Sequence, residues 1–203
     1  MRRLASFFSW YALVATCLVT DLSIAQDQPQ QQEYSEDMLF TCHIRANLAN
    51  AGESVYWSDL DSCNAALAQE QNLSRVELLA TIQNRAVLLM ELTEFDRARD
   101  DLERAASLDP ESAELQINLG MLHFVEQNFD EAIEYFSLVA ESSEQRSLAL
   151  FNRALSFGYS GELDLALQDL ALLKQEFPQE FSQWVNSPTS RVFPELVAQL
   201  EEF

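Results

Sequence analysis

The fold is decided by residues 117–133, INLGMLHFVEQNFDEAI, because the pattern of this stretch returns 34 residues before it and 34 residues after it. An asparagine, an alanine, an aspartate and two large apolar positions all repeat with this step. The repeated residues are Asn84, Asn118, Asn152 and Asn186; Ala98, Ala132 and Ala166; Asp96, Asp130 and Asp164; Phe95, Phe129 and Leu163; and Leu102, Phe136 and Leu170. Several independent columns with one period indicate stacked supersecondary units, none of which can bury its apolar face alone.

Each unit has the spacing of two helices separated by a short break. In the first unit, apolar residues recur at helical intervals in two sets, Ile82, Ala86, Leu89 and then Ala98, Leu102, Ala105. The facing positions of the two helices hold small residues, which lets the backbones approach closely; they are Ala86, Gly120 and Ala154 opposite Ala98, Ala132 and Ala166. The repeated aspartates begin the second helices, where we expect them to cap free N–H groups at the positive end of the helix dipole. Only 4 Gly and 5 Pro in the whole chain also favour an all-α fold.

These motifs resemble those of the tetratricopeptide repeat family. The matching stretches are Gln83-Asn84-Arg85-Ala86, Ile117-Asn118-Leu119-Gly120, Phe151-Asn152-Arg153-Ala154, Asn128-Phe129-Asp130-Glu131-Ala132-Ile133 and Leu108-Asp109-Pro110. The resemblance implies a right-handed α-solenoid of three helix pairs, over residues 79–112, 113–146 and 147–180. The sequence departs from the family pattern late in the second helix of each unit. The small Ala105 of the first unit is replaced by Val139 and Leu173 in the next two, so we expect looser packing toward the C-terminus.

The pattern continues weakly after the third unit. Trp184 and Asn186 hold the signature places of a fourth first helix, but Pro188 falls where the small packing residue belongs, so that helix must end or bend there. Residues 191–201 return to helical apolar spacing. We therefore expect a partial repeat and a capping helix over residues 181–203.

Residues 1–25 have the features of a secretory signal peptide. Arg2 and Arg3 provide a positive start, an apolar run follows, and Ser23-Ile24-Ala25 offers small residues for cleavage. Two alternatives stay open: an uncleaved membrane anchor, for which the apolar run is short, and a lipid anchor at Cys17, whose preceding residues resemble a lipobox. Residues 26–36 are rich in glutamine and predict a flexible tether. We expect an exported protein, with the periplasm as its compartment.

The mature chain keeps two cysteines, Cys42 and Cys63, and an oxidising compartment favours a disulfide between them. If residues 37–51 and 56–70 are antiparallel helices, the two sulfur atoms lie on facing helices at similar heights. The bridge would then staple a divergent helical hairpin over residues 37–72. The alternative is a pair of free buried thiols, and no metal-ligand spacing is present around them.

Charge and the scarcity of reactive side chains limit the classes of function. Removal of the signal peptide takes away two arginines and one aspartate, which leaves 10 basic and 32 acidic residues and a net charge of 10 − 32 = −22. Such a field disfavours nucleic acid and anionic membrane partners. The chain has two histidines, His43 and His123, and neither a phosphate-binding glycine loop nor a paired nucleophile and base. We expect neither catalysis nor a cofactor nor a metal.

In the tetratricopeptide family the first helices line a concave groove that holds partner segments, and the resemblance places nine residues of this chain there. They are Asn84, Val87, Ile117, Asn118, Met121, Phe124, Phe151, Asn152 and Leu155. An asparagine amide can bind a partner's backbone through its donor and its acceptor, while methionine and aromatic side chains supply contact area. The alternative is that these residues only pack against the neighbouring repeat.

The leading hypothesis is a non-catalytic adaptor or scaffold of the cell envelope or secreted space, which binds a protein or peptide in the groove. The second and third units, through residues 161–170, also resemble repeats of bacterial envelope adaptor lipoproteins. The alternative hypothesis is a structural subunit of an envelope complex that is bound through its convex face or its ends.

Overall fold

The computed structural model describes residues 37–49, 52–141 and 144–185. Residues 37–49 form a helix. The elements that follow are η1 (Trp57–Asp59), α2 (Leu60–Leu67), η2 (Glu70–Asn72), α3 (Arg75–Glu91), α4 (Phe95–Leu108), α5 (Ala113–Val125), α6 (Phe129–Ala140), α7 (Arg146–Ser160), α8 (Leu163–Glu176) and α9 (Pro178–Val185). The predicted signal peptide, the tether, Cys17 and the predicted helix over residues 191–201 lie outside the described residues.

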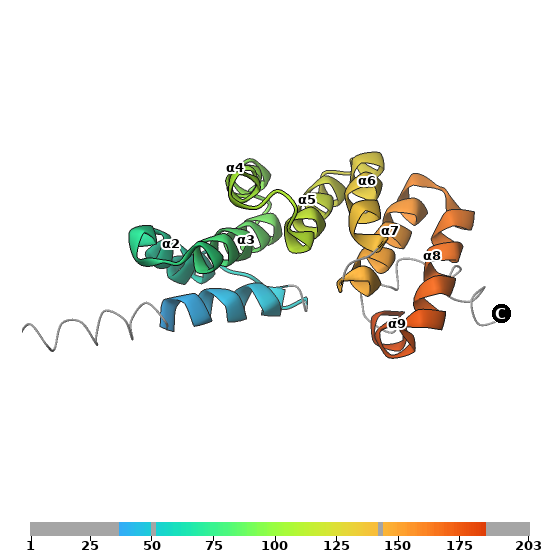
Figure 1. Cartoon of the computed structure of the whole chain (residues 1–203), viewed down its shortest axis with the longest axis horizontal. Coiled ribbons are helices and arrows are strands. Elements are labelled where there is room, and N and C mark those ends of the chain that lie inside the picture. The colour runs from blue at the N-terminus through green and yellow to red at the C-terminus, as the bar shows by residue number, and fades with distance from the viewer. Residues whose placement is uncertain (1–36, 50–51, 142–143, 186–203) are drawn as a thin grey trace, which may run out of the picture.

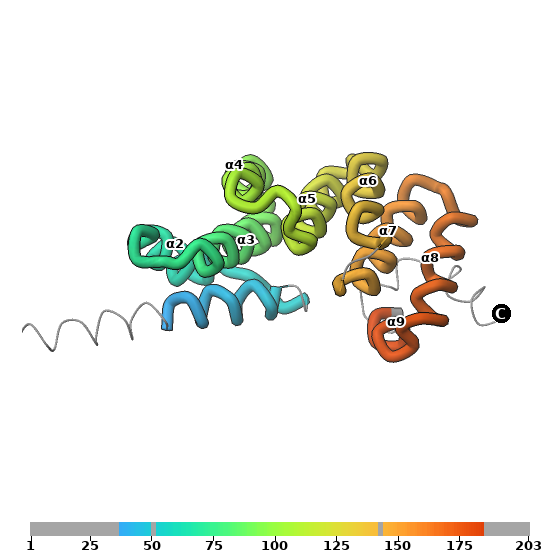
Figure 2. Tube along the Cα trace, in the orientation of Figure 1, coloured from blue at the N-terminus to red at the C-terminus, as the bar shows by residue number. Residues whose placement is uncertain are grey.

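The helices follow one another along the long axis of the molecule (Figure 1). The chain trace shows them as successive antiparallel pairs, α3 with α4, α5 with α6 and α7 with α8 (Figure 2). Each pair packs against the next, and within the described residues no strand is present. The predicted all-α helical repeat array is therefore confirmed.

Helix α5 joins two hydrophobic clusters of the array. Leu115 and Leu122 on α5 belong to a cluster that reaches back to the N-terminal hairpin, whereas Ile117 belongs to one that reaches forward to α8. Met121 packs against both clusters. The middle first helix is thus buried from both sides, which makes it the centre of the stack.

The turn inside each helix pair has the same backbone conformation in all three repeats. Thr93, Gln127 and Gly161 hold the same place in successive repeats and have φ angles of 61°, 65° and 93°. In the first turn, the Thr93 N–H donates to the Met90 carbonyl at 3.0 Å, and the next N–H donates to the Leu89 carbonyl at 2.9 Å. This left-handed conformation suits glycine and is strained for a β-branched residue such as Thr93. Because two of the three turns adopt it without glycine, the packing of the helix pair imposes the turn.

The repeated aspartates lie inside the first turn of the second helices and are not their capping residues. The N-caps of α4, α6 and α8 are Glu94, Asn128 and Glu162, and none of these makes a side-chain capping hydrogen bond. The hydrogen-bonded cap predicted for the aspartates is therefore wrong, while their favourable position at the helix dipole remains. A reciprocal cap occurs at α3 instead, where contacts with the Ser74 side chain and backbone lower the pKa of Glu77.

The small residues of each helix pair are buried where the two backbones approach. A Cβ atom added to Gly120 would lie 2.6 Å from Cε1 of Phe136, a side chain that is itself fully buried. At the same two positions, the first repeat combines Ala86 with Leu102, and the third repeat likewise combines alanine with leucine. Gly120 and Phe136 are therefore a matched pair, in which the larger ring fills the space of the absent methyl group.

Gly120→Ala is expected to lower the free energy of unfolding by about 1 kcal/mol. Overpacking a buried site costs roughly 1–3 kcal/mol, and the better helix propensity of alanine offsets only part of this cost. Adding Phe136→Leu recreates the alanine–leucine pair of the other repeats and is expected to restore stability. Urea denaturation followed by circular dichroism measures Gly120→Ala, Phe136→Leu and the double variant. If the losses of the two single variants simply add in the double variant, the residues do not compensate for each other.

The predicted disulfide joins the N-terminal helices. Cys42 and Cys63 are bonded and fully buried, with their Cα atoms 4.9 Å apart. An ion pair of 2.7 Å between Arg45 and Asp59 fastens the same two segments. The second segment, which the sequence predicted as one helix over residues 56–70, is divided into η1, α2 and η2. Asp59 contributes to this division, because it also accepts from the Tyr56 N–H at 2.7 Å and closes a separate first turn.

Candidate partner-binding face

The nine residues predicted to bind a partner lie on the first helices of the three repeats. We call this set the inner row: Asn84 and Val87 on α3; Ile117, Asn118, Met121 and Phe124 on α5; and Phe151, Asn152 and Leu155 on α7. These helices are neighbours in the stack. Six members are buried, with exposed fractions of 5% to 9%, and the other three, Met121, Phe124 and Leu155, are half-buried. The half-buried three are the accessible margin of the row.

One amide of the inner row is used inside the protein. Asn118 Nδ2 donates to Gln83 Oε1 at 3.3 Å, and this contact links α5 to α3. Gln83 is 2% exposed, so the amide pair is shielded from water. The side chains of Asn84 and Asn152 make no hydrogen bond with another described residue. The three asparagines therefore share a column but differ in their local partners.

The C-terminal end of the inner row contacts the helix that follows the third repeat. The ring centroids of Phe151 on α7 and Trp184 on α9 are 5.3 Å apart. Trp184 packs against the second hydrophobic cluster, of which Phe151 is a buried member. Phe151 thus takes part in packing between successive helical units.

Three aromatic rings gather where the turn after α5 meets the end of α7. Phe124 is 5.6 Å from Phe129 and 5.3 Å from Tyr159 between ring centroids, both edge to face, and Phe129 stacks on Tyr159 at 5.5 Å. We call these three residues the aromatic corner. Tyr159 is 44% exposed. The corner therefore continues the accessible margin of the inner row toward solvent.

Two models of the tetratricopeptide repeat match the chain, one over residues 84–147 and the other over residues 148–180. Residues 84–180 are tetratricopeptide repeats. The inner row and the aromatic corner both lie within them, so the residues singled out above belong to the repeat array itself.

The tetratricopeptide repeats are similar to known proteins in sequence and in fold. The lipoprotein NlpI homolog of Haemophilus influenzae is 33% identical over 106 residues, which cover 48% of this chain and 34% of that protein. The match thus spans about a third of the relative's length. The solved structure of MamA MSR-1 C2 has a TM-score of 0.52 at 15% identity, over 82% of this chain and 97% of that one. MamA AMB-1 P212121 has a TM-score of 0.51 at 15% identity, over 82% and 92%. These structures show the fold alone.

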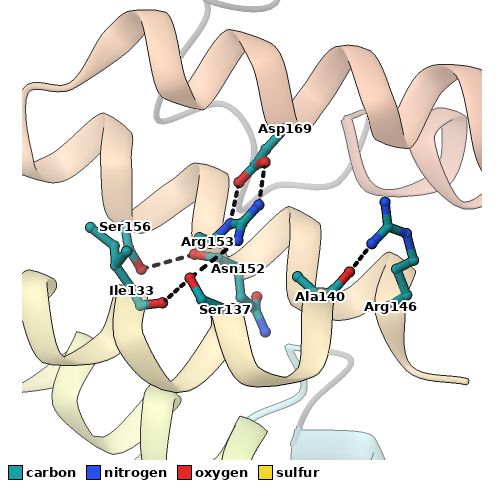
Figure 3. A network of polar contacts seen from close by, with 8 residues as sticks. All are labelled: Ile133, Ser137, Ala140, Arg146, Asn152, Arg153, Ser156 and Asp169. Atoms are coloured by element: carbon teal, nitrogen blue, oxygen red, sulfur yellow. Dashed lines mark hydrogen bonds and ion pairs between the residues drawn. The ribbon is translucent and has the colours of Figure 1, made fainter. Parts of the chain in front are cut away.

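The first and third tetratricopeptide repeats each contain a buried ion pair. Arg153 Nε and Nη2 donate to the two oxygens of Asp169, both at 2.7 Å (Figure 3). Arg85 and Asp101 make the same pair at 2.8 and 2.6 Å. The two aspartate side chains are only 5% and 7% exposed, although the sequence analysis did not single them out. The sequence did contain a signal for this pair, because Arg85 and Asp101 recur two repeat periods later as Arg153 and Asp169.

Each of these arginines also reaches the preceding part of the stack. Arg153 Nη1 donates to Ser137 Oγ on α6 at 3.1 Å, and Ser137 Oγ donates to the Ile133 carbonyl at 2.7 Å (Figure 3). Arg85 Nη1 donates to Asn64 Oδ1 on α2 at 3.0 Å. One guanidinium therefore connects both helices of its own repeat to the helix before them, which sets the register of the stack.

The middle tetratricopeptide repeat replaces the ion pair with neutral residues. Leu119 and Tyr135 occupy the places of the arginine and the aspartate. The Tyr135 ring stacks on His123, with ring centroids 5.4 Å apart and planes 16° from parallel. His123 therefore packs against an aromatic ring of its own repeat.

The chain carries excess negative charge, because its 33 acidic residues outnumber its 12 basic ones. The eight described arginines each pair with a carboxylate or donate to a carbonyl within the protein; they are Arg45, Arg75, Arg85, Arg97, Arg99, Arg104, Arg146 and Arg153. Within the described residues no three metal-ligating side chains lie together, and no helix there has the length and apolar character needed to cross a membrane. Electrostatics therefore favours positively charged partners over anionic ones.

Proposed function

We propose that this protein is a non-catalytic adaptor that binds a segment of another protein along the inner row. Tetratricopeptide repeats typically bind proteins. The observation that carries the proposal is the accessible margin of Met121, Phe124 and Leu155, on two adjacent first helices. Methionine and aromatic side chains offer adaptable apolar contact area, and a few such anchors supply most of the binding energy of many interfaces.

The asparagines supply the polar part of the proposed interface. Asn84 and Asn152 make no side-chain hydrogen bond with another described residue, although they are 9% and 7% exposed. Their amide groups are not among the buried atoms that lack a partner, so they keep some access to solvent and can offer a donor and an acceptor to the backbone of a bound segment. Asn118 differs, because one of its amide hydrogens is held by Gln83.

The proposal includes export, with the periplasm as the compartment. Two observations support it. The buried Cys42–Cys63 disulfide is of the kind that persists in oxidising compartments. The repeats are also similar to a protein named a lipoprotein. A lipid anchor at Cys17 is the alternative mode of export, and mass spectrometry of the mature N-terminus distinguishes it from cleavage after Ala25.

Capture of a partner by the purified protein tests the proposed face. Met121→Ala with Leu155→Ala is expected to reduce capture of the partner about tenfold or more, because two apolar anchors are removed from the margin. Leu138→Ala is the matched control, since Leu138 is an apolar side chain on α6 that is 66% exposed and lies outside the inner row. Quantitative mass spectrometry of material bound from an exported fraction measures both variants, after circular dichroism shows that they are folded.

The second candidate is a structural subunit that is bound through an end of the array. It is favoured by Phe40 and Ile44, which are 65% and 38% exposed and lie one turn apart on the helix over residues 37–49. Phe40→Ser with Ile44→Ser separates the two candidates. Loss of the partner in this variant, with full capture by the Met121 and Leu155 variant, would move the site from the inner row to the N-terminal end.

A further inference from the structure

The aromatic corner exposes part of its ring surface, which a large apolar side chain of a partner could contact. Phe124, Phe129 and Tyr159 come from three consecutive helices and contact one another pairwise at 5.3–5.6 Å. Phe124 and Phe129 are half-buried and Tyr159 is 44% exposed, so the cluster is anchored in the protein and open on one side. Leu163, which begins α8 and is 49% exposed, extends this apolar surface beyond the turn that follows Tyr159.

Two exposed carboxylates, Asp130 and Glu162, adjoin the aromatic corner in the sequence. Asp130 follows Phe129 directly in the first turn of α6 and is exposed. Glu162 is also exposed and follows Tyr159 by three residues; the Ser160 hydroxyl lies 3.2 Å from its Oε1 and 3.0 Å from the Phe157 carbonyl, and shares its hydrogen between them. Arg99, which reaches the α5–α6 turn from α4, is occupied by both oxygens of Glu126 at 2.5 and 2.6 Å. The exposed charged residues that adjoin the corner in the sequence are therefore acidic, and the nearby Arg99 is already paired with Glu126.

We infer that the aromatic corner binds a partner segment that carries a large apolar residue with lysine or arginine beside it. The apolar residue would contact the three rings, and the cationic side chains would meet Asp130 and Glu162. A second copy of this chain is a poor occupant, because both copies carry a net charge of −21. The inference rests on the proposed function, since the corner continues the margin of the inner row, and it adds the chemistry of the partner.

A labelled peptide tests the inference directly. The probe is a fluorescein-labelled hexapeptide with a central leucine–phenylalanine pair and two basic residues on each side, and fluorescence anisotropy measures its dissociation constant. Two matched probes replace either the central pair with serines or the four basic residues with serines. The basic apolar probe is expected to bind best, and its affinity is expected to fall as salt is added.

Variants of the corner locate the bound probe. Tyr159→Ser is expected to weaken binding about fivefold or more, because an aromatic anchor is removed. Asp130→Asn with Glu162→Gln is expected to weaken it about threefold at low salt and to flatten the salt dependence. Asp96→Asn with Asp100→Asn on α4 is the charge-matched control and is expected to leave binding unchanged, as is Leu138→Ser.

Equal binding of the basic and the serine-flanked probes, unchanged binding by Tyr159→Ser, or no binding of the basic probe would each overturn the inference. The proposed function is scored separately by partner capture with the Met121 and Leu155 variant. If that variant loses the partner while the basic and serine-flanked probes bind equally, the inner row remains the proposed binding face. Only the proposed basic chemistry of the partner is then wrong. If the variant retains the partner, the assignment of the binding face to the inner row is wrong.

Discussion

Replacing Asp169 with alanine is expected to lower the free energy of unfolding by about 3 kcal/mol, because Arg153 is then left without its carboxylate. The Asp169 side chain is 5% exposed and accepts both arms of the guanidinium, whereas the Arg153 side chain keeps 20% of its area exposed. This remaining access to water places the expected loss at the lower end of the range for a broken buried pair. Urea denaturation followed by circular dichroism measures the loss.

The middle repeat provides the matched control for this prediction, because it holds Leu119 and Tyr135 at the same two places. Arg153→Leu with Asp169→Tyr is expected to recover most of the lost stability, since replacing both partners leaves no buried charge. The new tyrosine is expected to pack against Phe157, which occupies the place of His123 in this repeat. The ring centroid of Phe157 lies 5.9 Å from the guanidinium carbon of Arg153. A double variant as unstable as Asp169→Ala would mean that the salt bridge contributes more than the removal of an unpaired charge.

Removal of the Cys42–Cys63 bridge is expected to lower the stability of the N-terminal hairpin by about 3 kcal/mol on the chain-entropy account. The bridge joins residues separated by 21 positions in a hairpin at the end of the described array. A terminal unit of a repeat array packs against one neighbour only, so it has less packing to compensate for the loss. In Cys42→Ala with Cys63→Ala, hydrogen exchange is expected to lose protection in residues 37–49 and α2 while α7 and α8 keep theirs.

The wild-type protein, reduced after unfolding and refolded in the presence of dithiothreitol, is the control that separates the bridge from the alanine substitutions. Both cysteines are 0% exposed, so dithiothreitol is expected to reduce the folded protein slowly and the urea-unfolded protein rapidly. Unchanged exchange in residues 37–49 of the alanine variant would show that packing holds the hairpin without the covalent link.

For the inner row, the sequence predicted which positions share one face of the repeats but not which of these side chains are exposed. Columns separated by one repeat period predicted which side chains share a layer, because residues at equivalent positions of stacked helices line up. The exposure of those side chains did not follow from the columns. Asn118 is buried against Gln83 of another repeat, and Phe151 contacts Trp184 of α9, so each depends on a neighbour that its own unit does not contain.

The two buried arginine–aspartate pairs have a pattern in the sequence, but the pattern was recognised only after the structure had shown the contacts. Arg85 with Asp101 recurs as Arg153 with Asp169, but the middle repeat breaks the column, and acidic residues in a strongly acidic chain read as solvent-exposed. Burial of a carboxylate depends on the arginine that reaches it across the helix pair. That distance is set by packing and not by sequence spacing.

The sequence by itself determined the helical class and the repetition of helix pairs, and it favoured the pairing of Cys42 with Cys63. Each of these depends on local periodicity or on two residues brought together by one hairpin. Only the tertiary structure decided that Gly120 must be small because of Phe136, that Thr93 adopts a left-handed turn, and which members of the inner row meet solvent. The physical reason is that close packing is a property of pairs of surfaces, whereas a sequence pattern describes one surface at a time.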